Sequence, residues 1–94
     1  DEFGLSWKEK DLLCSVIEAE SNFNIKAENE FSKDYGICQI NEFYWIGQGK
    51  HFTSIDEVLN FPEKSIRFLI KSYKEGHLNW WIAYKSGAYK KYLV

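Results

Sequence analysis

The sequence predicts one α+β domain that is predominantly helical and carries a small β-hairpin region. Its 94 residues suit a single domain, which we expect to span positions 1–94. Hydrophobic residues make up 45% of the chain and aromatic residues 18%, enough to fill a core and to exclude disorder. Apolar residues recur at helical spacing, and one polar stretch rich in Asn, Lys, Glu and Ser interrupts them over residues 21–33.

The first helix is expected to run from an N-cap at Ser6 to about residue 20, because Ser6 and Glu9 form the pattern of a capping box. Its apolar stripe consists of Leu13, Val16 and Ile17, and the same spacing leads next to Glu20. A carboxyl group buried there would have a raised pKa and could act as a general acid. The alternative is a helix-end Glu that frays into water or pairs with a lysine.

The middle of the chain combines a polar run with a short apolar one. Residues 21–33 are predicted to be irregular or a small hairpin, and residues 35–40 a strand or a buried turn. Asp34 lies between them in a polar setting, where a carboxylate is expected to stay ionised. Two carboxyl groups with separated pKa values are typical of glycoside cleavage. Asp34 could instead be a turn residue that bonds to its own backbone.

Further helical segments are expected over residues 41–45, 54–59, 62–75 and 80–85, followed by a final turn over 89–93. Asn41, and either Thr53 or Ser54, are the predicted caps of the two short ones. Pro62 suits the first position of the long helix, and Gly76 the position after its end. The segment 80–85 is apolar on nearly every side, so we expect it to be interior.

Composition and motifs exclude several classes of function. The net charge of −2 is spread along the chain without a basic block, so nucleic acid is not an expected partner, and no apolar run is long enough to span a bilayer. His51 and His77 stand alone, so no metal site is predicted, and no nucleotide motif or other cofactor signal is present. Cys14 and Cys38 could pair with each other or be two buried thiols.

Several sequence stretches together resemble the lysozyme-like superfamily. The stretch 20–24, ESNFN, with Ala27, the stretch 34–37, DYGI, and the stretch 39–41, QIN, resemble the active-site region of c-type lysozymes. The stretch 81–87, WIAYKSG, after a predicted helix, resembles the lytic transglycosylase (SLT domain) pattern, with Lys85 in place of an Asn. The resemblance implies a lysozyme-like fold. Only 13 residues separate Glu20 from Asp34, so it also implies a trimmed hairpin.

The resemblance implies a role for each matching residue. Glu20 corresponds to the catalytic acid of both families, and Asp34 to the second carboxylate of c-type lysozymes. Trp81 corresponds to the aromatic residue that packs against the acid, and Tyr84 to the transglycosylase tyrosine that approaches it. The remaining expected substrate-binding residues are Ser21, Gln39, Asn41 and Trp45. Other aromatic side chains predicted to flank the groove are Phe43, Tyr44 and Trp80.

These roles imply a peptidoglycan-cleaving muramidase that acts on the β-1,4 bond between N-acetylmuramic acid and N-acetylglucosamine. One alternative is a lytic transglycosylase that releases a 1,6-anhydro-muramyl product. Another is a non-catalytic wall-binding or structural module of a phage or secretion apparatus. We expect a monomer that acts on glycan strands outside the cytoplasm, secreted, periplasmic or virion-associated. The chain has no methionine and no signal-peptide pattern, so a processed product or an excised domain is expected.

Overall fold

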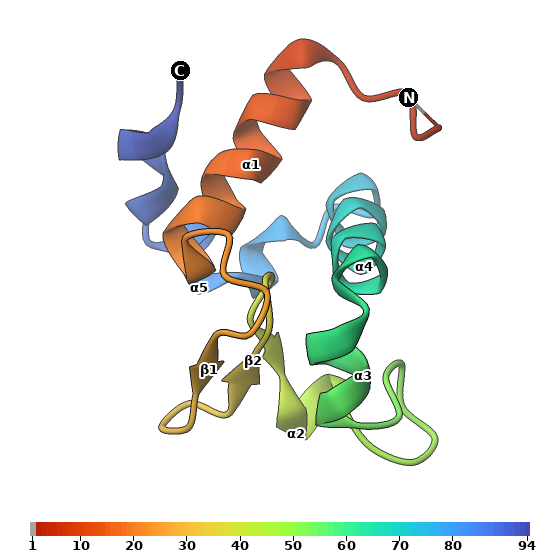
Figure 1. Cartoon of the computed structure of the whole chain (residues 1–94). Helices are drawn as coiled ribbons and strands as arrows, with labels where there is room; N and C mark the ends of the chain where they lie inside the picture. The colour runs from red at the N-terminus through yellow and green to blue at the C-terminus, as the bar shows by residue number, and fades with distance from the viewer. Residues whose placement is uncertain (1) are drawn as a thin grey trace.

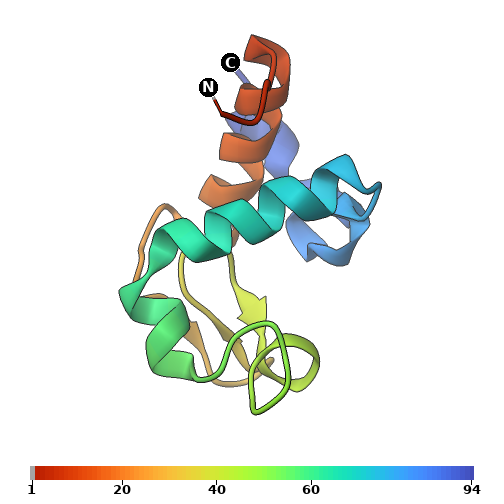
Figure 2. The ribbon, with the colours of Figure 1, turned by 90° about the vertical axis from the view of Figure 1, so that its right-hand side faces the viewer.

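The chain folds into two groups of elements, one around its first helix and one around a small sheet (Figure 1). The structure is a computed structural model and describes residues 2–94. Helix α1 (Trp7–Ser21) and the C-terminal segments form one group, and the sheet with two short helices forms the other. Helix α4 (Pro62–Lys74) crosses between the two groups, as the view in Figure 2 shows. The predicted α+β, predominantly helical class is confirmed.

Helix α1 begins and ends as the sequence predicts. The Glu9 N–H donates to Ser6 Oγ at 3.1 Å and the Ser6 N–H donates to Glu9 Oε1 at 2.8 Å, which completes the capping box. Asn22 ends the helix in a left-handed conformation with φ 55°. The three stripe residues between Leu13 and Ile17 are buried. The apolar face of this helix therefore packs on the core, and Glu20 continues that face on the last turn.

The sheet is small, antiparallel and ordered β1-β2-β3. Its strands are β1 (Glu28–Asn29), β2 (Asp34–Tyr35) and β3 (Ile40–Asn41), each of two residues, so the expected short hairpin is present. The register pairs Asp34 with Asn41 across β2 and β3. Paired residues of neighbouring strands lie on the same face. The side chain of Asn41 is thereby brought to the carboxylate of Asp34.

A buried turn, residues 36–39, connects β2 to β3. Gly36 has φ +82°, and a Cβ on it would lie 2.8 Å from Cγ1 of Val58, so only glycine suits both the backbone and the packing. Ile37 and Cys38 are buried in the same turn. Of the two structures that the sequence allowed for residues 35–40, the buried turn is the one found.

Side-chain caps define the two short helices beside the sheet. Helix α2 (Glu42–Trp45) is capped by Asn41, whose Oδ1 accepts a backbone N–H at 3.2 Å. Helix α3 (Ile55–Asn60) is capped by Ser54, whose Oγ accepts a backbone N–H at 3.1 Å. Both predicted helices are confirmed, as is the long α4 with proline at its start.

The C-terminal part consists of the 3₁₀ helix η1 (Leu78–Trp80), helix α5 (Ile82–Lys85) and the 3₁₀ helix η2 (Ala88–Tyr92). Helix α1 packs along η2 and against α5. This packing places the N-terminus of α5 beside the last turn of α1. The final turn predicted near the C-terminus corresponds to η2.

The prediction of one interior helix over residues 80–85 was wrong. Trp81 has an extended backbone, with φ −92° and ψ 126°, and it separates η1 from α5. Trp81 itself is buried, but Trp80 on one side is 47% exposed and Ile82 on the other is 69% exposed. An apolar run without a polar face gives no periodicity from which to choose the inward side. The long-range hydrogen bond from Trp81 to the Cys38 carbonyl determines which side faces inward.

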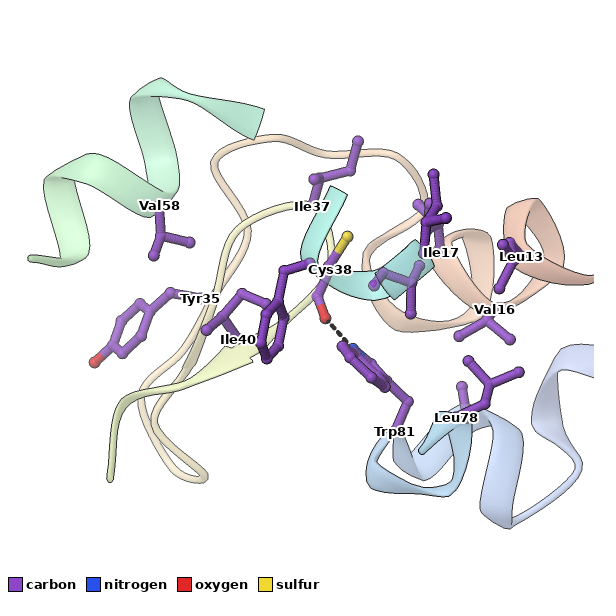
Figure 3. Close-up of a cluster of buried hydrophobic side chains, with 14 of the residues drawn as sticks. Leu13, Val16, Ile17, Tyr35, Ile37, Cys38, Ile40, Val58, Leu78 and Trp81 are labelled. Carbon is purple, nitrogen blue, oxygen red and sulfur yellow. Dashed lines mark hydrogen bonds between the residues drawn. The ribbon is translucent and has the colours of Figure 1, made fainter. Parts of the chain in front are cut away.

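A single core joins the two groups of elements (Figure 3). Helix α1 contributes Leu13, Val16 and Ile17, and the sheet side contributes Tyr35 and its neighbours. Further core residues are Ile37, Cys38, Ile40, Ile46, Phe52, Val58, Phe68, Leu69, Ile70, Leu78, Trp81 and Ala83. Among the described residues, no helix combines the length and apolarity needed to cross a bilayer.

The two cysteines are free thiols with different surroundings. Cys38 is fully buried, which raises the pKa of its thiol. The expectation of a buried thiol holds for Cys38 but was wrong for Cys14, which is exposed on α1. Cys14 stands at the border of the apolar stripe, and the structure places it on the solvent side.

Candidate active site

A cleft of about 620 Å³ lies between the end of α1, the sheet, α2 and the η1–α5 segment. Carboxyl and amide groups occupy part of its wall, and apolar rings occupy the rest. The lining residues are Glu20, Ser32, Asp34, Gln39, Ile40, Asn41, Tyr44, Trp45, Phe68, Trp80, Trp81 and Ile82. A cleft with mostly apolar walls and a few convergent polar groups is typical of a ligand site.

Glu20 is half-buried at the end of α1, where its side chain borders the cleft. Its Oε2 accepts the backbone N–H of Ala83 at 3.0 Å, across 63 positions of sequence. Burial raises the pKa of Glu20, the hydrogen bond from Ala83 lowers it in part, and the negative charge of Asp34 raises it further. The net direction is upward, as expected for a carboxyl group on an apolar stripe. The alternatives of a frayed end or a lysine partner are not what the structure shows.

Asp34 borders the same cleft from the central strand of the sheet. Ser32 Oγ donates to its Oδ2 at 2.7 Å, and Asn41 Nδ2 donates to its Oδ1 at 3.0 Å. Both carboxylate oxygens are thus held by side-chain donors, and neither of these donors is the Asp34 backbone that a simple turn residue would use. The two carboxyl groups share one cleft and differ in their donors: Glu20 accepts one backbone N–H, whereas Asp34 accepts two side-chain donors.

The buried turn 36–39 connects the parts of the site. Ser21 Oγ donates to the Ile37 carbonyl at 2.6 Å, which fixes the end of α1 to the turn. Trp81 Nε1 donates to the Cys38 carbonyl at 2.7 Å, the dashed bond in Figure 3. Gln39 has φ 52°, and its Nε2 donates to the Gly36 carbonyl at 3.0 Å. Ser21, the residue after Glu20, and Trp81, two residues before Ala83, are therefore both anchored to one turn.

Aromatic rings form the apolar part of the cleft lining. Trp45 packs on Phe68 and on Trp80, with ring centroids 4.9 Å and 5.0 Å apart. Phe68 packs in turn on Trp81, at 5.9 Å. Trp81 is 5% exposed and Trp80 is 47% exposed, so one is mostly core while the other presents its ring to the cleft.

The structure brings most of the predicted site residues together. Those that line the cleft are Glu20, Asp34, Gln39, Asn41, Trp45 and Trp81. Ser21 and Tyr84 do not. Ser21 bonds to the turn rather than to the carboxyl of Glu20, and it borders a second, shallower hollow. Tyr84 is half-buried and stacks on Tyr89, with ring centroids 5.2 Å apart.

Sequence reasoning did not single out four cleft residues, Ser32, Ile40, Phe68 and Ile82, although Ile40 stands inside the stretch 39–41 that carries the resemblance. Ser32 stands two positions before Asp34 in the polar run, and that spacing was a usable signal for a side-chain bond to the carboxylate. Phe68 and Ile82 carried no such signal, because apolar residues reach a cleft only through tertiary packing. Within residues 2–94, no three His, Cys, Asp or Glu side chains gather in an arrangement that could hold a metal ion.

The fold and the cleft together define a class of protein: a lysozyme-like α+β domain with two carboxyl groups in one cleft. The chain belongs to the transglycosylase SLT domain family, whose profile matches residues 6–91. It is also 33% identical over 86 aligned residues to Lysozyme C-1 from Capra hircus. That alignment covers 79% of this chain and 66% of the lysozyme, just under two thirds of its length. No solved structure matches significantly.

Proposed function

We propose that this protein is a muramidase that cleaves the β-1,4 bond between N-acetylmuramic acid and N-acetylglucosamine in peptidoglycan. The observation that carries the proposal is the pairing of a desolvated Glu20 with a hydrogen-bonded Asp34 in one cleft. Two carboxyl groups with such different surroundings divide the roles of acid and stabiliser in glycoside cleavage. Lysozyme is the standard example of this division of roles between two carboxyl groups, and the proposed mechanism follows it.

In this mechanism Glu20 is the general acid. Its Oε2 accepts the Ala83 N–H, so the proton belongs on the other oxygen, Oε1. From there it passes to the glycosidic oxygen as the bond to the anomeric carbon breaks. Burial raises the pKa of Glu20, and this keeps the proton in place for the transfer. General acid catalysis of this kind contributes about 10²–10⁴-fold to the rate.

Asp34 stabilises the positive charge that develops on the sugar, as a nucleophile or as an electrostatic partner. The donors Ser32 and Asn41 keep its two oxygens oriented. A water molecule then attacks the anomeric carbon and gives its proton to Glu20, which now acts as a base. This step regenerates the acid and yields a hydrolysed product.

A polymeric substrate fits the surface around the acid. A second, shallower hollow shares Glu20 and Gln39 with the main cleft, so depressions lie on both sides of the acid. A glycan strand needs room on both sides of the bond that is cut. We propose that a single chain is the active unit. The proposed substrate lies outside the cytoplasm, and so does the proposed site of action.

The family match supports a second product. In a transglycosylase the 6-hydroxyl of the muramyl sugar attacks the anomeric carbon in place of water, while Glu20 accepts the hydroxyl proton. The product is a 1,6-anhydro-muramyl end. Mass spectrometry of digested peptidoglycan separates the two reactions, because the anhydro product is lighter by one water molecule. We favour hydrolysis, since Asp34 and its two donors are all present.

Clearing of a cell-wall suspension by wild type and Glu20→Gln tests the enzyme proposal. We expect Glu20→Gln to lose at least about 10²-fold in clearing rate. Glu63→Gln is the matched control, because Glu63 is exposed on α4 and lines neither the main cleft nor the second hollow. If wild type and Glu20→Gln behaved alike, the protein would be the non-catalytic wall-binding module instead. Asp34→Asn, tested in the same assay, separates a hydrolase that needs this carboxylate from a transglycosylase that does not.

A further inference from the structure

We propose that Trp80 is a stacking platform for an N-acetylhexosamine ring of the glycan and sets the affinity of the cleft for its substrate. This inference rests on the proposed function and extends it to a residue that the catalytic scheme does not use. Trp80 lines the cleft and is 47% exposed, a high value for the largest apolar side chain. Tryptophan rings offer a flat apolar face that suits the apolar face of a sugar ring.

The indole of Trp80 is held in place before any sugar arrives. The ring of His77 stacks on it with centroids 4.3 Å apart and planes 4° apart. Trp45 packs on it at 5.0 Å with a tilt of 42°. Two aromatic neighbours restrict the rotamers of Trp80, so little side-chain entropy is lost when a ligand binds. A free surface Trp would lack such support.

The wall around Trp80 is apolar and uncharged. The cleft residues beside it are Trp45, Trp81 and Ile82, none of which carries a charge. A neutral sugar ring matches these side chains better than an anionic group, because an anion placed there would lose water without gaining a partner.

The platform is close to the acid. Ala83, whose N–H holds Glu20, follows Trp80 by three residues, so their Cα atoms are at most about 11 Å apart. A ring on Trp80 therefore belongs to the same short stretch of glycan as the bond that Glu20 protonates. We expect Trp80 to act on binding, and therefore on KM, while kcat changes little.

The test measures binding of N-acetylglucosamine tetramer by calorimetry, with Glu20→Gln as the parent so that no turnover occurs. Adding Trp80→Ala should weaken binding roughly 5- to 20-fold, whereas Trp80→Phe should retain most of the affinity. Trp7→Ala is the matched control, because Trp7 is 65% exposed on α1 and does not line the cleft. It should bind like the parent. Circular dichroism checks that each variant is folded.

His77 is a positioning residue in this proposal, and its variants separate support of the ring from general destabilisation. His77→Phe keeps an aromatic ring under Trp80 and should preserve binding, while His77→Ala should weaken it several-fold. Equal affinities of the Trp80→Ala protein and the parent would overturn the proposal, as would absence of binding by the parent at millimolar sugar. Neither result touches the muramidase proposal, which depends on the clearing assay with Glu20→Gln.

Discussion

The Glu20→Gln substitution also tests the burial of the acid without any substrate. Glutamine has nearly the shape of the protonated acid, and its amide oxygen can accept the Ala83 N–H as the carboxyl oxygen does. It cannot ionise. Comparing the free energy of unfolding of the two proteins therefore isolates the cost of placing a charge at this position.

The sign of the effect follows from the raised pKa. The folded protein binds the Glu20 proton more tightly than the unfolded chain, because burial raises the pKa in the fold. This contribution to stability is fully present below the unfolded pKa, near 4.3, and is lost as pH rises through the folded pKa. Within that window wild type should lose up to about 1.4 kcal/mol per pH unit relative to Glu20→Gln.

Urea unfolding of both proteins at steps between about pH 3 and pH 8 provides the measurement. The difference in unfolding free energy between them should grow with pH in favour of glutamine and then level off. A difference that stays constant across the range would mean that Glu20 has the same pKa folded and unfolded. That outcome would refute the net upward shift of the Glu20 pKa and, with it, the assignment of Glu20 as a protonated acid.

Three further predictions concern the tryptophan anchor, the buried turn and the pH profile. Trp81→Phe removes the donor to a buried carbonyl 2.7 Å away, so the free energy of unfolding should fall by about 1–3 kcal/mol. For a domain of this size, that lowers Tm by roughly 4–24 °C, whereas Trp80→Phe at an exposed ring should change it little. Gly36→Ala should cost about 1–3 kcal/mol in a denaturant titration, because its Cβ would clash with Val58 and its φ is +82°. The kcat/KM for soluble glycan strands should decrease as pH rises, because Glu20 must be protonated to act as the acid. The pKa of this decrease should lie above the ordinary glutamate pKa, and a decrease at the ordinary value would contradict the role of Glu20.

Local signals in the sequence were sufficient for most elements of the fold. The capping box at Ser6, the caps at Asn41 and Ser54, and the proline that opens α4 each fix a helix start through contacts within a few residues. Such contacts form in the same way whatever the rest of the chain does. The apolar stripe of α1 also predicted that Glu20 would be drawn into the interior.

The contacts that assemble the site lie beyond such signals. The bonds from Ala83 to Glu20, from Trp81 to Cys38 and from Ser21 to Ile37 join positions 63, 43 and 16 residues apart. No local pattern distinguishes these partners from other residues of the same type. Trp81 has an extended backbone and donates to the Cys38 carbonyl, so two short helices, η1 and α5, lie on either side of it. One helix over 80–85 was predicted because no residue near Trp81 signals this break. For Asp34, whose role the residues alone left open, the resemblance added the role of second carboxylate; it also supplied Tyr84, which the structure places outside the cleft.

The anchoring of two segments to one turn makes the acid independent of the hairpin tip. Residues 30–33 connect β1 to β2 and are exposed, whereas the turn 36–39 that carries the bonds from Ser21 and Trp81 is at the other end of β2. A longer or shorter loop at the tip would leave Glu20 and its Ala83 donor where they are. The hairpin tip is thus a place where the loop could be lengthened without rebuilding the end of α1 that carries Glu20, as long as Ser32 keeps its bond to Asp34.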